Sequence, residues 1–165
     1  ITVSNADCPD ALHFFRSKGS ISDVNIQNAS FDALDTDFSD LTVKKVFVNK
    51  AAQECIGVKS GYYTFEKVIL KNCSDKAISA GALSVVSIND ANIEKSNTGV
   101  WAKDSSQINI ISYDFKDVNK CIGSVRGEKK YLGSTVNIKK LKSECSVKSY
   151  ITDNISKILI DKDVF

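Results

Sequence analysis

The chain has 165 residues, of which 42% are hydrophobic and 25% are charged, so it is long enough and apolar enough to bury the core of one domain. Its 22 basic and 20 acidic residues leave a net charge of +2, which argues against nucleic acid as a partner. No apolar run approaches the roughly 18 residues of a membrane span. The 17 Ile and 15 Val against 8 Leu favour strands over helices.

The sequence repeats about every 22 residues, beginning with Asp10-Ala11-Leu12 and Asp32-Ala33-Leu34. A small residue followed by an aliphatic one recurs at this interval as far as Cys121-Ile122. A second pattern, apolar-x-x-apolar-x-apolar, fills the other half of each unit. In chain order its members are Ile21/Val24/Ile26, Val43/Val46/Val48, Phe65/Val68/Leu70, Ile88/Ala91/Ile93 and Ile110/Tyr113/Phe115, followed more loosely by Ile138/Leu141 and Ile155/Ile158/Ile160.

Such a unit cannot bury its own apolar face, but stacked units can, with parallel strands about 4.8 Å apart. The repeat therefore predicts an all-β fold, a right-handed parallel β-helix of about seven coils with a 22-residue period. A leucine-rich-repeat solenoid is the alternative. It fits less well because the apolar positions prefer Ile and Val and the second half of the unit lacks a helical pattern.

We expect one β-helix domain over residues 1–165. Residues 126–134 lengthen their unit by about four residues and predict an inserted surface loop. Residues 1–9 and 147–165 stand at the open ends of the coil, where they either cover the strand edges, join another domain or mediate self-association. Because the chain contains no Met, even at position 1, we expect it to be a fragment or C-terminal module of a larger protein.

From about Asp10 to Phe165, these columns resemble the right-handed parallel β-helix repeat proteins, the pectin-lyase-like superfamily. More narrowly, the stretches at 32–39, 74–79, 103–106 and 128–133 look like segments of bacterial β-helix proteins of unassigned activity. The resemblance implies chemistry on polysaccharides, such as lyase, hydrolase or epimerase activity. It also implies a cell-envelope or secreted location.

Strand alternation predicts an outward stripe after each aliphatic position and a second one two residues further on. The first stripe is His13, Asp35, Gly57, Ser79, Trp101 and Gly123, and the second is Phe15, Asp37, Lys59, Gly81, Lys103 and Val125. His13 is the only histidine, and Asp35 is expected beside it on the next coil. This pair, with Asp37 and Lys59, is the candidate catalytic patch: a base, its orienting acid and a cation for a uronate carboxylate. An ordinary surface ion pair is the alternative.

Asp35 and Asp37 lie two residues apart on one face and are also a candidate calcium site, although no known calcium-loop spacing is present. We expect no other cofactor. An exposed Trp beside small residues is a candidate sugar platform, because a pyranose ring can lie on an aromatic face. The alternative is that the Trp covers the neighbouring coil and that the charged residues solvate the surface. The candidate ligand-binding residues are Trp101, Lys103, Lys76, Lys129, Lys130 and Tyr131.

The five cysteines are Cys8, Cys55, Cys73, Cys121 and Cys145. Members of one column are about three coils apart, too far for a disulfide, so the register predicts that all five are unpaired. Unpaired thiols favour a reducing compartment, against the location implied by the resemblance, and the localisation stays open.

Three functions follow as hypotheses. The first is a non-catalytic module that binds polysaccharide or presents an interaction surface to another domain of its parent protein. The second is a polysaccharide lyase, epimerase or glycoside hydrolase that acts on an acidic polysaccharide. The third is a structural element that assembles through its open ends.

Overall fold

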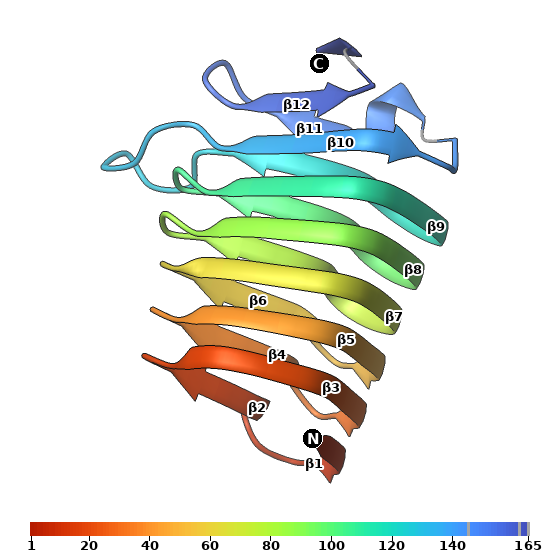
Figure 1. Ribbon diagram of the computed structural model, residues 1–165. Helices are drawn as coiled ribbons and strands as arrows, with labels where there is room; N and C mark the ends of the chain where they lie inside the picture. Colours follow the sequence, from red (N-terminus) through yellow and green to blue (C-terminus); the bar gives the residue numbers. More distant parts are fainter. Residues whose placement is uncertain (145, 162, 165) are drawn as a thin grey trace.

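The computed structural model describes residues 1–144, 146–161 and 163–164. Within them the chain winds into a right-handed parallel β-helix of about seven coils, as the repeat predicts (Figure 1). Each coil crosses the front of the view, turns at the right and returns behind, while the chain climbs from the N-terminus to the C-terminus. No helix among the described residues is long and apolar enough to cross a lipid bilayer.

Two parallel ladders form the walls of the coil. The first contains β1 (Thr2–Ala6), β3 (Lys18–Ala29), β5 (Asp40–Ala51), the first parts of β7 (Tyr62–Gly81), β8 (Val85–Lys103) and β9 (Gln107–Val125), then β10 (Thr135–Leu141) and β12 (Lys157–Ile160). The second contains β2 (Asp10–Phe15), β4 (Asp32–Asp37), β6 (Ile56–Lys59), the last parts of β7, β8 and β9, and β11 (Tyr150–Thr152). A 3₁₀ turn spans Val147–Ser149, and β13 (Asp163–Val164) pairs antiparallel with β12.

The core consists of the apolar columns seen in the sequence. Val46, Val68 and Ala91 stack on successive coils and are completely buried. Leu34, Ile56 and Ile78 do the same on the second ladder, at 1%, 0% and 0% exposure. Each residue is buried by the coils above and below it, so one unit alone would leave these side chains in water.

Left-handed residues form the two corners of each coil. At one corner they are Asn5, Asn28, Lys50, Asn72, Lys95 and Asp117, and at the other Arg16, Phe38, Ser60, Ala82 and Asp104, all with φ between 44° and 72°. Asn and Asp tolerate this conformation better than most residues. Side-chain hydrogen bonds support the first corner, where Asn28 Nδ2 donates to Asn5 Oδ1 at 2.9 Å.

The inserted segment 126–134 is a loop, as expected, but it lengthens its unit more than expected. Gln107 pairs with Thr135, 28 residues later, so this unit exceeds the repeat by about six residues rather than four. The Asp104 carboxylate holds the loop, because its Oδ1 accepts hydrogen bonds from the backbone N–H groups of Gly127 and Glu128 at 2.8 and 2.7 Å.

The prediction that every cysteine is unpaired is wrong. Cys55 and Cys73 form a disulfide, with Cα atoms 5.6 Å apart. They belong to different columns on either side of one corner: Cys73 stacks on Ala51, only four residues before Cys55. The prediction compared only cysteines of the same column, so it did not consider this pair, whose members lie on neighbouring coils and face each other across the corner. Unpaired thiols no longer argue for a reducing compartment, although Cys8 is an exposed free thiol.

Candidate functional site

The outward stripe of the second ladder has the predicted register. His13 pairs with Asp35, Asp35 with Gly57, Gly57 with Ser79, Ser79 with Trp101, and Trp101 with Gly123. The stripe is less open than strand alternation suggests, since Asp35 is 9% exposed and Ser79 4%. Side chains from neighbouring coils cover much of this face, so its free surface is a groove rather than a flat strip.

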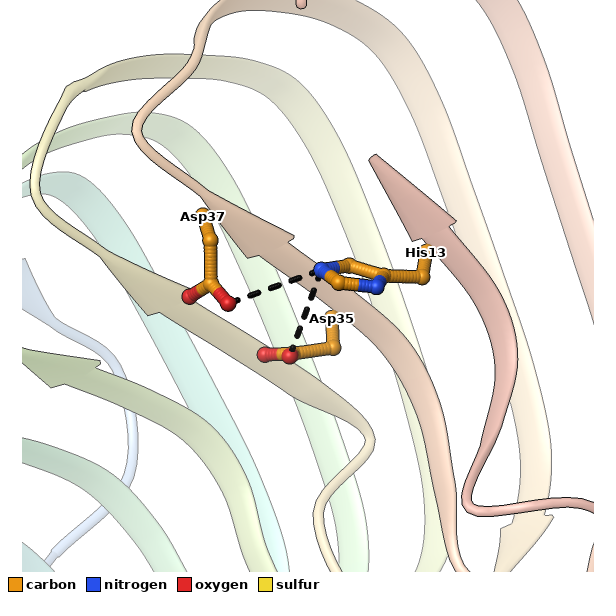
Figure 2. Close-up of side chains that lie close together, drawn as sticks. All are labelled: His13, Asp35 and Asp37. Carbon is orange, nitrogen blue, oxygen red and sulfur yellow. Dashed lines mark ion pairs between the residues drawn. The ribbon is translucent and has the colours of Figure 1, made fainter. Parts of the chain in front are cut away.

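The four residues of the predicted catalytic patch lie together at the N-terminal end of this face. His13 Nε2 is 3.8 Å from Asp35 Oδ2 and 3.5 Å from Asp37 Oδ2, and all three side chains converge on one point (Figure 2). Lys59 Nζ lies 3.8 Å from Asp37 Oδ1, on the other side of that carboxylate. Asp10, which is not part of the predicted patch, approaches the second imidazole nitrogen, with Oδ2 3.8 Å from His13 Nδ1.

Asp35 is the most perturbed carboxyl group of the patch. Burial raises its pKa from 3.8 to about 6, and the neighbouring carboxylates of Asp37 and Asp10 add to the rise. The cations Lys59 and His13 act in the opposite direction without cancelling it. Within the described residues Asp35 makes the ion pair with His13 but no hydrogen bond. Such a group is costly to keep ionised, because little replaces its lost hydration.

A polar groove of about 240 Å³ begins at Asp35 and follows the stripe toward the C-terminus. Its lining combines two glycines with charged groups of both signs: Asp32, Asp35, Glu54, Asp75, Lys59 and Lys103. A side chain at Gly57 would fill the groove, because its Cβ would lie 2.9 Å from Asp35 Oδ1 and 3.0 Å from Glu54 Oε2. These two oxygens therefore both border the space over Gly57.

The lysines define the other end of the groove. Lys103 lies over Gly81, where an added Cβ would be 3.2 Å from Lys103 Cε and 3.9 Å from Lys59 Cγ. Lys76 is not a free cation, because it hydrogen-bonds Glu54 Oε1 at 3.2 Å and also contacts Asp75 Oδ2. Burial alone would lower the pKa of Lys76, but these carboxylates outweigh it and raise the pKa. Lys76 therefore anchors the Glu54 side chain beside the groove.

The remaining predicted ligand-binding residues do not join this groove. Trp101 is half-buried and lies over Gly123, whose added Cβ would be 2.0 Å from Trp101 Cε3. In the inserted loop, Lys130 pairs with Glu128 at 2.9 Å and lies over the ring of Tyr131 at 5.0 Å. Lys129 is exposed in the same loop.

A second hollow, of about 480 Å³, lies on the first ladder. Its lining is Lys67, Ile69, Leu70, Lys71, Asn92, Ile93, Glu94, Asp114, Phe115 and Lys116. Two of its opposite charges neutralise each other, because Lys71 Nζ is 2.9 Å from Glu94 Oε2. None of its carboxyl groups is as buried as Asp35, so we place the candidate site on the second ladder.

The predicted site residues left out four carboxylates of the site. Asp10, Asp32 and Glu54 occupy the column that opens each unit, and that column was a usable signal because it runs beside the predicted patch. Asp75 had no such signal. It lies where the register between β7 and β8 shifts, between Cys73 and Lys76, so the repeat does not predict its direction.

Comparisons with protein-family models, with curated proteins and with solved structures found no match to this chain. The β-helix architecture is thus established by the structure itself. The functional assignment depends on the chemistry of the groove and of the cluster beside it.

Proposed function

We propose that this β-helix is a module that binds polysaccharide in the groove over Gly57 and Gly81. The observation that carries the proposal is the groove itself: a glycine floor, with the carboxylates of Asp32, Glu54 and Asp75 toward the start of the strands and the amino groups of Lys59 and Lys103 toward their ends. Sugar hydroxyls both donate and accept hydrogen bonds, so they match a lining of both kinds. The regular spacing of the coils also suits a polymer of repeating sugar units, as in the polysaccharide-acting β-helix proteins that the repeat resembles.

The two ends of the groove predict a preference among polymers. Asp32, Asp35 and Glu54 accept hydrogen bonds from hydroxyl groups, while Lys59 and Lys103 attract a carboxylate. A polymer with both free hydroxyls and uronate carboxylates satisfies both ends. A neutral polymer satisfies only the acidic end, and a densely sulfated one would be repelled there.

Binding can be measured by calorimetry against a panel of uronate, neutral and sulfated polysaccharides. Lys103→Ala removes a charged donor from the groove and should weaken uronate binding about tenfold or more. Lys44→Ala is the matched control, because Lys44 is exposed on β5 of the opposite ladder. Equal binding by both variants, or no binding to any polymer on the panel, would rule the proposal out.

A second candidate function is hydrolysis of a glycosidic bond in the same groove, favoured by Asp35 and Glu54. Their oxygens each lie about 3 Å from one point over Gly57, so they are at most about 6 Å apart, and retaining glycosidases place their carboxyl groups about 5–5.5 Å apart. Asp35, with a pKa of about 6, is a proton donor in mildly acidic solution, while Lys76 positions Glu54 as the nucleophile. Release of reducing ends, lost in both Asp35→Asn and Glu54→Gln, is the expected result. If either variant still releases reducing ends at the parental rate, these roles are contradicted.

A further inference from the structure

We infer that His13, Asp35 and Asp37 form a binding site for a divalent transition-metal ion, with Zn²⁺ as the best-matched ion. The ligands would be His13 Nε2 and one carboxylate oxygen each from Asp35 and Asp37. This site shares Asp35 with the groove of the polysaccharide proposal, but it needs neither Glu54 nor Lys103.

The geometry fits a single ion without rearrangement of the backbone. The three ligand atoms lie within 4.8 Å of one another, with His13 Nε2 3.5 and 3.8 Å from the two carboxylates (Figure 2). Zinc ligands at about 2.0–2.2 Å in tetrahedral directions are about 3.3–3.6 Å apart, so small side-chain movements suffice. The backbones are fixed in advance, because His13 and Asp35 are ladder partners on β2 and β4 and Asp37 lies two residues further on the same face.

The state of Asp35 is an independent reason to expect a cation. This residue is 9% exposed overall and 12% exposed at its side chain, points into the cluster, and has His13 as an ion-pair partner but no hydrogen-bond donor within the described residues. A buried carboxylate in a folded protein ordinarily has such partners. A bound cation would supply the missing interaction for Asp35 and for the Oδ2 of Asp37 together.

The surroundings have the form that metal-binding histidines require. Asp10 Oδ2 lies 3.8 Å from His13 Nδ1, where it can accept a hydrogen bond from Nδ1–H once a metal ion takes the lone pair of Nε2. Lys59 approaches only Oδ1 of Asp37 and leaves Oδ2 to the cluster. With a neutral imidazole, the three carboxylates and one ammonium group sum to a charge of −2, which a divalent ion neutralises.

The ligand set favours a transition metal over calcium. Imidazole is a good ligand for zinc, whereas calcium takes six to eight oxygen atoms. Three protein ligands leave a fourth zinc position open, and His13, at 37% side-chain exposure, lies on the open side. An ion here would keep Asp35 ionised, so metal binding and the proton-donor role of Asp35 in glycoside hydrolysis exclude each other.

The test is calorimetry of Zn²⁺ binding to the full chain after EDTA treatment, at about pH 7.5, where imidazole is mostly neutral. All variants are made in a Cys8→Ser background, because Cys8 is an exposed thiol that can bind zinc by itself. We expect one ion per chain, about 100-fold weaker binding in His13→Ala and Asp37→Asn, and about 10- to 100-fold weaker binding in Asp10→Asn. Asp23→Asn, an exposed carboxylate on β3, is the matched control and should bind as the parent does.

NMR gives a second readout that misfolding cannot imitate. His13 is the only histidine, so its imidazole signals are a single set, and Zn²⁺ should shift Nε2 strongly while Nδ1 stays protonated. Absence of saturable binding up to about 1 mM Zn²⁺, unshifted His13 signals, or parental affinity in His13→Ala would each overturn the inference. Polysaccharide binding measured with EDTA present is expected to persist, so failure of one proposal is distinguishable from failure of the other.

Discussion

Replacing Asp35 by Asn should stabilise the protein at neutral pH. Burial raises the pKa of Asp35 from 3.8 to about 6 in the folded chain. Between these values the unfolded chain releases its proton first, so the folded state binds more protons and stability falls as pH rises. The stability that protonated Asp35 contributes to the folded state is fully present below about pH 4, and it is lost above about pH 6. Two pKa units correspond to about 3 kcal/mol, because each unit is worth about 1.4 kcal/mol.

Asn has nearly the same shape as protonated Asp and cannot ionise. The stability difference between Asp35→Asn and the parent should therefore be near zero at about pH 4 and reach about 3 kcal/mol by about pH 7.5. Urea unfolding followed by circular dichroism, with EDTA present to remove metal, measures this difference across the pH range. In a chain of this length the midpoint of thermal unfolding should rise by about 6–12 °C.

The control is Asp23→Asn, which removes the same charge from an exposed position. Its effect should stay within about 0.5 kcal/mol. If Asp35→Asn is no more stable than the parent at neutral pH, or if the difference does not change with pH, burial of this carboxylate does not act as described. A stabilised variant that also fails to bind zinc would show that this position is optimised for a ligand rather than for stability.

Three further predictions concern the fold. Ile110→Ala should lower the free energy of unfolding in urea by about 2–5 kcal/mol and Ile111→Ala by less than about 0.5 kcal/mol, because these neighbours are 1% and 49% exposed. Similar losses in the two variants would refute the register. Reduction of the Cys55–Cys73 disulfide, which closes a separation of 18 residues, should cost about 3 kcal/mol, and a non-reduced peptide map without this linked pair would exclude it. Tyr63→Phe should lower the free energy of unfolding by about 1–2 kcal/mol, because the buried hydroxyl of Tyr63 donates to backbone carbonyls and accepts from a backbone N–H. Parental stability of this variant would show that these hydrogen bonds contribute nothing.

The predicted patch and the observed cluster agree because both follow from local rules. Once the period places His13 beside Asp35, alternation along β4 places Asp37 on the same face, and one more coil adds Lys59. No long-range information is needed for these neighbours. Trp101 follows the same rules, since its place on the stripe sets it beside Gly123 on the next coil, which it covers.

The Cys55–Cys73 disulfide and the groove depend on contacts across corners. Whether Cys73 reaches Cys55 depends on how sharply the chain turns after Asn72, a left-handed residue with φ of 57°. Glu54 likewise enters the groove through its contact with Lys76 on the next coil. A periodic pattern gives the direction of side chains along a strand but contains no information about turn angles.

Composition and periodicity alone determined the solenoid, its period and the facing of each strand, because repeated apolar columns can be buried in only one way, by stacking. The tertiary structure decided which columns meet at the corners, that Asp35 is nearly buried, and that Asp10, Asp32, Glu54 and Asp75 complete the charged site. Those features arise from side-chain packing between coils, where the chain is not periodic, and the candidate function depends on them.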